Sequence, residues 1–202
     1  MYNISLRFLK LLPPELAHSL TINSLKYLNF RSKKNDDPIL SQHLLGLDFP
    51  NPIGLAAGFD KNADVMRSMF SFGFGFVEVG TITPMPQKGN SKPRVFRLKE
   101  DEAIINSLGF NNKGSVKIKK NLLNFRNAEI NTQIIGINIG KNKFSLNAID
   151  DYIYSIENLA NLSSYIVINI SSPNTPGLRN LQLRGNIEKL IKKILDKRDQ
   201  IE

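Results

Sequence analysis

Four short apolar segments recur along the chain, and each ends in small or polar residues. They are NPIGLAAG (51–58), FGFVEVGT (74–81), QIIGINIG (133–140) and YIVINIS (165–171). Stretches with helical spacing follow them, which we place at 61–72, 113–127, 147–161 and 185–199. Continuous apolar strands that alternate with helices are typical of parallel βα units. The pattern therefore predicts an α/β fold in which the four strands are parallel and adjacent in sequence order.

Two further segments depart from this alternation. Leucines recur through the first 29 residues around a break at Pro13 and Pro14, which predicts helices over 3–12 and 14–29. The polar stretch RSKKNDDP then indicates a linker, so we expect an N-terminal helical domain over 1–37 and a second domain over 38–202. Within the second domain, residues 94–98 and 103–106 predict a β-hairpin.

The composition excludes several kinds of site. The chain has 202 residues, a formal charge of +9, no cysteine and two histidines. Without cysteine there is no disulfide, thiolate zinc site or cysteine nucleophile, and two distant histidines offer little for a metal centre or a serine–histidine triad. The lysines are scattered without interleaved aromatic residues, so we expect no nucleic-acid partner. No apolar run reaches the length of a membrane-spanning helix, and no secretory signal is recognisable at the start.

The strand ends are the most informative positions for function. In parallel α/β folds, ligands bind at the carboxyl ends of the strands. Asn138 and Asn169 occupy matching places in INIG and INIS, which suggests two amides directed into one pocket that suits a planar heterocycle. A purely structural tie between strands is the alternative. Lys61, which follows the first strand, is either a surface charge or part of the same site.

The segment after the fourth strand, NISSPNTPGLR, is rich in hydroxyls and prolines. Pro173 and Pro176 push the residues before them toward extended backbone, and Gly177 supplies a flexible point. One interpretation is an ordinary proline-rich turn. The other is a loop that holds the hydroxyl of Ser172 and folds over a substrate.

Several of these motifs together resemble one enzyme family. The segments NPIGLAAGFDKN, GFGFVEVGTITPMPQKGNSKPRVFRL, INSLGFNNKG, GINIGKNK and NISSPNTPGLR are similar to those of class 2, quinone-dependent dihydroorotate dehydrogenase. The resemblance implies a (β/α)8 TIM barrel that contains FMN and carries an N-terminal two-helix domain. It also implies oxidation of dihydroorotate to orotate in de novo pyrimidine (UMP) biosynthesis, with electrons passed to ubiquinone or menaquinone.

The resemblance also implies roles for individual residues. Ser172 would be the base that takes a proton from substrate C5 while hydride leaves C6, where class 1 relatives use a cysteine. FMN would contact Ala57, Gly58, Phe59, Asp60, Lys61, Thr81, Asn138 and Asn169. The substrate would contact Lys61, Asn106, Ser107, Leu108, Gly109, Phe110, Asn169 and Asn174. His18 and Arg97 would line the quinone tunnel, and no metal is implied.

By the same resemblance, the N-terminal helices would dock on a membrane surface, which places the protein peripherally on the cytoplasmic face of the inner membrane. A (β/α)8 barrel takes about 250 residues, whereas residues 38–202 supply about four βα units. We therefore expect a barrel truncated before its fifth strand and inactive by itself. The alternatives are a non-catalytic remnant and a module that binds membrane surfaces.

Overall fold

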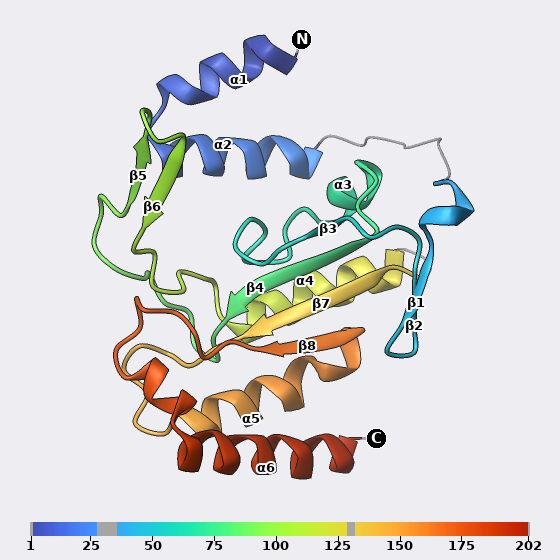
Figure 1. Cartoon of the computed structure of the whole chain (residues 1–202), viewed down its shortest axis with the longest axis vertical. Helices are drawn as coiled ribbons and strands as arrows, with labels where there is room; N and C mark the ends of the chain where they lie inside the picture. Colours follow the sequence, from blue (N-terminus) through green and yellow to red (C-terminus); the bar gives the residue numbers. More distant parts are fainter. Residues whose placement is uncertain (1, 28–35, 129–131, 202) are drawn as a thin grey trace.

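A four-stranded parallel sheet forms the centre of the protein (Figure 1). The computed structural model describes residues 2–27, 36–128 and 132–201. The strands lie in the order β3 (Gly54–Leu55), β4 (Phe76–Ile82), β7 (Ile134–Ile139) and β8 (Tyr165–Ile168). All neighbouring pairs are parallel, which confirms the predicted order. The sheet is open, since the part of the chain described here closes no barrel.

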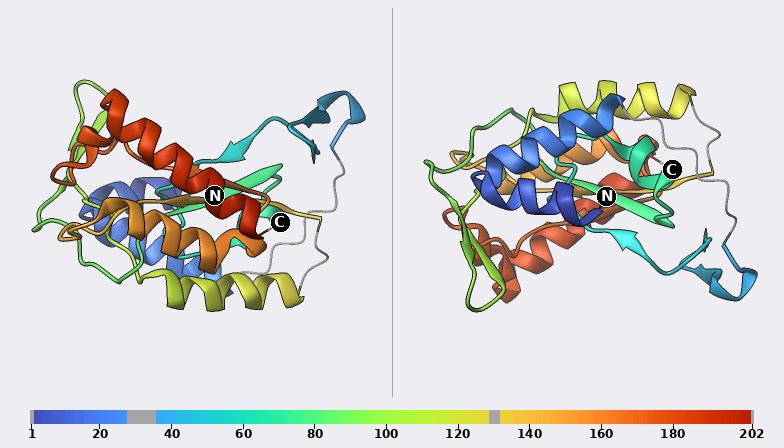
Figure 2. Two further views of the ribbon diagram at one scale, coloured as in Figure 1. Left: turned by 90° about the horizontal axis from the view of Figure 1, so that it is seen from below. Right: turned by 90° about the horizontal axis from the view of Figure 1, so that it is seen from above.

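Helices cover one face of this sheet and enclose the core. They are α3 (Met66–Ser71), α4 (Ser115–Ala128), α5 (Ala148–Leu159) and α6 (Arg184–Ile201). Val77 and Ile137 of the sheet are fully buried together with Leu122 of α4 and Tyr152 of α5. Farther out, α6 packs on α5 (Figure 2). Leu190 of α6 is almost fully buried. Burial of these apolar side chains is the main force that holds the helices to the sheet.

The other face of the sheet pairs glycines with aromatic rings. Gly54 is the register partner of Phe76, and Gly136 is the register partner of Tyr165. A Cβ at either glycine would collide with the ring opposite it. Each ring therefore occupies the space above the glycine on the neighbouring strand. A residue with a side chain at that position would fill this space. The Tyr165 hydroxyl donates to Glu78 at 3.3 Å, and burial, with the nearby Glu78 carboxylate, raises the pKa of Tyr165 to about 12.

Two hairpins stand outside the sheet. The hairpin of β5 (Val95–Leu98) and β6 (Ala103–Asn106) was predicted and is confirmed. The hairpin of β1 (Gln42–Leu44) and β2 (Leu47–Phe49) was not predicted. It turns through Leu45 and Gly46, both with positive φ, and leucine is not a residue that signals such a turn.

The N-terminal helices α1 (Tyr2–Leu11) and α2 (Pro14–Tyr27) form close to their predicted positions, with α2 nearer the sheet and α1 beyond it (Figure 1). The end of α2 is held by a buried hydrogen bond of 2.6 Å from the Ser68 hydroxyl on α3 to the Leu25 carbonyl. Most of the predicted linker lies outside the described residues, so the domain boundary stays a prediction. No helix in the described ranges is long and apolar enough to cross a membrane.

The helix predicted over 61–72 is shorter than expected. Its first part is a loop, because the Asp60 carboxylate accepts hydrogen bonds from the backbone N–H groups of Asp64 and Val65 at 2.7 and 2.8 Å. Ala63 in between has a φ of 55°, which interrupts helical backbone. The helix predicted over 147–161 ends as a 3-10 turn, η2 (Ala160–Leu162). Two further 3-10 turns, η1 (Pro38–Leu40) and η3 (Leu178–Gln182), complete the fold.

Candidate active site at the carboxyl ends of the strands

Three polar side chains from three strands meet where the strands end. The Thr81 hydroxyl donates to the Asn138 side-chain oxygen at 2.6 Å. The Asn169 amide donates to the Thr81 hydroxyl at 3.0 Å and to the Asn138 oxygen at 3.2 Å. Thr81 and Asn138 are buried and Asn169 is half-buried. The two asparagines predicted to share one pocket do lie together, and they also tie neighbouring strands.

Both asparagines of this cluster are fixed by further bonds. The Asn138 amide donates to the Glu78 carboxylate at 2.9 Å, which determines how the amide is oriented. The buried Tyr152 hydroxyl on α5 donates to the Asn169 carbonyl at 2.9 Å. Burial raises the pKa of Tyr152, so this hydroxyl stays a neutral donor. The cluster is therefore held rigidly from the core side, as a binding site for a planar ligand requires.

The loop after β3 supplies a cation close to this edge of the sheet. The Gly58 N–H donates to the Gly80 carbonyl at 2.9 Å, which holds the loop beside the end of β4. Gly58 has a φ of 112° and open space where a Cβ would lie, so a ligand can approach its backbone. The Lys61 ammonium donates to the Gly58 carbonyl at 2.8 Å.

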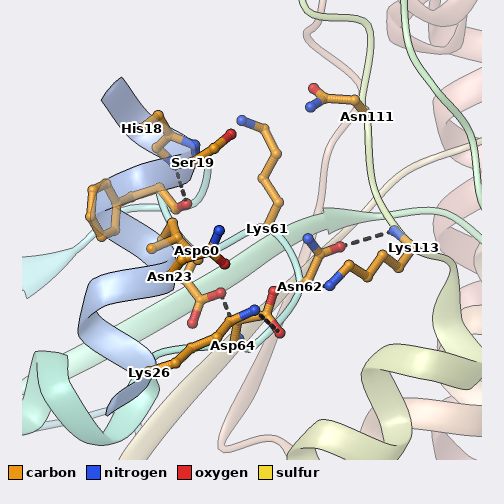
Figure 3. Close-up of a pocket in the computed structure, with 12 residues that line it drawn as sticks. His18, Ser19, Asn23, Lys26, Asp60, Lys61, Asn62, Asp64, Asn111 and Lys113 are labelled. Atoms are coloured by element: carbon orange, nitrogen blue, oxygen red, sulfur yellow. Dashed lines mark hydrogen bonds and ion pairs between the residues drawn. The ribbon is translucent and has the colours of Figure 1, made fainter. Parts of the chain in front are cut away.

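Lys61 also faces a cavity of about 240 Å³ beneath α2 (Figure 3). His18 and Asn111 line the same cavity. Burial, and after it the nearby Arg94 charge, lower the pKa of Lys61, while Glu15 opposes this change. Asp60, beside Lys61, is almost fully buried. Burial raises the pKa of Asp60, although the hydrogen bonds that it accepts from backbone N–H groups act to lower it.

The predicted substrate and base residues lie on two loops near the same edge. Asn106 ends β6 and is exposed, and Ser107, Leu108 and Phe110 are half-buried, while Gly109 is buried. Ser172 and Asn174 follow β8 and are half-buried. The Asn174 N–H points at the Ser172 hydroxyl oxygen at 3.3 Å.

The two predicted quinone residues make different contacts, and their shared role stays a prediction. The His18 Nε2 atom lies 2.8 Å from the Phe59 carbonyl, and its ring meets the Phe59 ring edge-on at 5.4 Å between centroids. The Arg97 guanidinium instead donates to the carbonyls of Lys10 and Leu12 at 3.1 and 2.7 Å, where it caps the end of α1.

Comparison with known proteins identifies the family. Residues 39–202 match the family described as "Dihydroorotate dehydrogenase". The chain belongs to the dihydroorotate dehydrogenase family. It is 48% identical over 198 residues to "Dihydroorotate dehydrogenase (quinone)" of Bradyrhizobium sp. (strain ORS 278), a match that covers 98% of this chain and 54% of that protein. The protein of the same name from Rhodopseudomonas palustris (strain BisA53) is 47% identical.

Solved structures agree with this assignment. The ligand-free DHODH of Eimeria tenella superposes with a TM-score of 0.86 at 44% identity and covers 94% of this chain and 54% of that one. A second structure, of the same enzyme in complex with ferulenol, also gives a TM-score of 0.86. The chain spans about half the length of the relatives it matches, and its open sheet is consistent with part of a TIM barrel.

The strand-end residues fit the flavin that the resemblance to dihydroorotate dehydrogenase implies. A flavin ring is planar and carries hydrogen-bond donors and acceptors along one edge, which suits the amides of Asn138 and Asn169. The space beside the Gly58 backbone is open, so a ligand can approach it. Asn111 lines the cavity beneath α2 that Lys61 faces. Its side-chain oxygen is buried and has no hydrogen-bond partner among the described residues, so the cavity retains an unused acceptor.

Sequence reasoning missed one ion pair that borders the site. Arg94 is 5% exposed and donates to the Glu15 carboxylate of α2 through Nε at 3.1 Å and Nη2 at 2.8 Å. The Arg94 hydrogen bonds lower the pKa of Glu15, although burial opposes them. The glutamate lies 79 positions away, so no local motif joins it to Arg94.

We predict a pH-dependent loss of stability in Glu15→Gln. A carboxyl group whose pKa is lowered on folding stabilises the fold above its ordinary pKa of 4.5, and this contribution disappears as the pH falls through the folded-state value. The variant should lose roughly 2 kcal/mol of unfolding free energy near neutral pH, because Arg94 stays buried without its carboxylate. Urea denaturation should show the deficit shrinking below the ordinary glutamate pKa.

The matched control is Glu188→Gln, which removes an exposed glutamate paired with Arg184 on α6. Its effect on stability should stay within about 0.5 kcal/mol. A Glu15→Gln deficit of the same size in acid and at neutral pH would contradict the ion-pair explanation.

Proposed function

We propose that the chain forms the part of a quinone-dependent dihydroorotate dehydrogenase that binds FMN from one side and supplies the catalytic base. The enzyme would oxidise dihydroorotate to orotate in de novo pyrimidine biosynthesis and pass the electrons to ubiquinone or menaquinone. The observation that carries the proposal is the Thr81–Asn138–Asn169 cluster at the strand ends of a chain that belongs to this family.

The reaction removes a proton from substrate C5 and a hydride from C6, so that a C5–C6 double bond forms. FMN, when bound, supplies the acceptor for the hydride. The C5 proton would go to the Ser172 oxygen while the hydroxyl passes its own proton on to water, and this oxygen faces the Asn174 N–H. Donation from this N–H favours the deprotonated form of the serine, which is otherwise a weak base. The amide of Asn174 and the segment 106–110 would hold the substrate on the same side.

The predicted FMN contacts gather around the end of β4. The loop Ala57–Lys61 lies on one side of Thr81, and Asn138 and Asn169 lie on the other. The Lys61 ammonium would balance the negative charge of the flavin or of the substrate carboxylate. Burial is the main cause that lowers the pKa of Lys61. As the pH rises, Lys61 therefore loses its proton, and with it this attraction, before an exposed lysine would.

The 202 residues alone should show no turnover. In the described part of the chain, β8 pairs only with β7, so its second edge lacks a partner strand. Open strand edges promote association with other chains, and a half sheet contacts a flavin from one side only. Activity is therefore best tested in a chimera, in which the part of the Bradyrhizobium relative that this chain does not cover follows residue 202.

In this chimera, Ser172→Ala should slow reduction of the flavin by dihydroorotate. Loss of a general base typically costs about 10²–10⁴-fold, and FMN content should not change because the serine contacts the substrate side. Stopped-flow absorbance of the flavin gives the rate. Ser71→Ala on α3, whose hydroxyl bonds only within its own helix turn among the bonds described, should reduce at the normal rate. A normal rate in Ser172→Ala would move the base elsewhere.

We also propose that α1 and α2 contact the membrane surface on the cytoplasmic side of the inner membrane, where a quinone partner would be reached. Among the side chains described on these helices, five large apolar ones remain exposed: Phe8, Leu11, Leu16, Leu20 and Tyr27. Lys10 adds positive charge beside them. An exposed apolar surface with basic residues suits the boundary of an anionic bilayer.

Replacement of Leu16 and Leu20 by serine should weaken binding of the 202-residue chain to phosphatidylglycerol vesicles by roughly tenfold, since buried apolar area is lost. Co-sedimentation measures the bound fraction. The matched control replaces Leu123 and Leu195, which are 39% and 42% exposed against 47% and 42% for the test pair. Equal losses in both variants would refute a specific membrane face.

A further inference from the structure

One asparagine outside the predicted site joins three of the loops at the strand ends. Asn90 lies on the crossing loop, which we define as residues 83–94 between β4 and β5. Its amide nitrogen donates to the Ser107 carbonyl at 2.9 Å and to the Asn174 carbonyl at 3.3 Å. Its side-chain oxygen accepts from the Lys143 ammonium at 2.9 Å. The donors reach the loops after β6 and β8, and the acceptor reaches the loop after β7.

The backbone of Asn90 is held on both sides. Its N–H donates to the Leu108 carbonyl at 3.0 Å, and its carbonyl accepts from Arg94 Nη1 at 2.8 Å. Gly89, with a φ of 76°, lets the loop approach this closely, because a Cβ there would collide with the Leu108 carbonyl. The Asn90 side chain is therefore presented from a fixed position.

A second side chain on the crossing loop supports the same arrangement. The Gln87 amide donates to the carbonyls of Gly109 and Phe110 at 3.1 and 3.2 Å. Its oxygen accepts from the Asn142 amide and from the Lys143 N–H at 2.9 and 3.0 Å. The crossing loop thus holds the predicted substrate segment and the loop after β7 without Asn90. Among the bonds between described residues, only the one from Asn90 to the Asn174 carbonyl extends this network to the loop after β8.

We propose that Asn90 is a positioning residue that fixes the loop carrying Ser172 and Asn174 against the substrate segment 106–110. The role rests on the proposed function, in which Ser172 acts as the base. An amide is suited to the position because two donors and one acceptor are needed on a short side chain. An aspartate would keep the acceptor for Lys143 but would turn an oxygen toward two carbonyls.

Hydrogen exchange measured by mass spectrometry on the 202-residue chain tests this role with two readouts. In Asn90→Asp, exchange over residues 172–178 should become about fivefold faster, which corresponds to loss of one hydrogen bond. Exchange over 142–145 should not change, since the carboxylate still accepts from Lys143. In Asn90→Ala, exchange over 172–178 should also become faster, while Gln87 still binds the backbone of the loop after β7. General loosening of the loops would instead accelerate both segments in both variants.

Asn124→Asp is the matched control, because it makes the same chemical change at an exposed position on α4. It should leave both segments as they are. Protection of β7 reports whether each variant is folded, and Asn90→Ala supplies the comparison over 172–178 should the aspartate variant unfold. Unchanged exchange over 172–178 in a folded variant, or equal acceleration of both segments in Asn90→Asp, would overturn the proposal. Neither flavin nor substrate is needed, so this outcome is independent of the test of Ser172 as base.

Discussion

The register between β4 and β7 is the constraint on which the site depends. The two strands pair regularly up to Val79, and the register then shifts before Ile82. Gly80 lies in this shift with a φ of 114°, and a Cβ there would collide with the Asn138 carbonyl. The close approach that glycine permits brings Thr81 within hydrogen-bond distance of Asn138. Without it, the three-strand polar cluster would not form.

The buried ion pair between Glu15 and Arg94 links the N-terminal helices to the crossing loop. Glu15 of α2 neutralises the buried Arg94 guanidinium, and Arg94 in turn binds the carbonyls of Lys88 and Asn90. A buried cation that satisfies several carbonyls needs a carboxylate nearby, because desolvation is otherwise too costly. The α2 helix therefore contributes to the shape of the crossing loop as well as to the exposed apolar surface.

The sequence predicted those features that depend on local patterns. Continuous apolar runs identified the strands of the sheet and their order, and repeated strand endings placed Asn138 and Asn169 at one edge. The helix start at Met66 was missed because it depends on the Asp60 carboxylate, which captures two backbone N–H groups in a loop. The tight turn between β1 and β2 was missed because Leu45 stands where asparagine or aspartate would normally indicate such a turn.

Contacts between distant segments could not be predicted in this way. Asn90 and Asn174 are 84 positions apart, and Glu15 and Arg94 are 79 apart. The segment PQKGNSKPR carries no periodic pattern, so its role becomes visible only when the strands have brought the loops together. The resemblance to dihydroorotate dehydrogenase supplied candidate residues at the strand ends, but not the polar loop that holds them.

The most direct test of the site is a crystal structure of the chimera with FMN and orotate bound. We predict that the flavin ring lies over Gly58, within hydrogen-bond distance of the Asn138 and Asn169 amides, with orotate between the ring and the loop that carries Ser172. A flavin bound away from the carboxyl ends of β4, β7 and β8, or orotate bound away from Ser172, would contradict it.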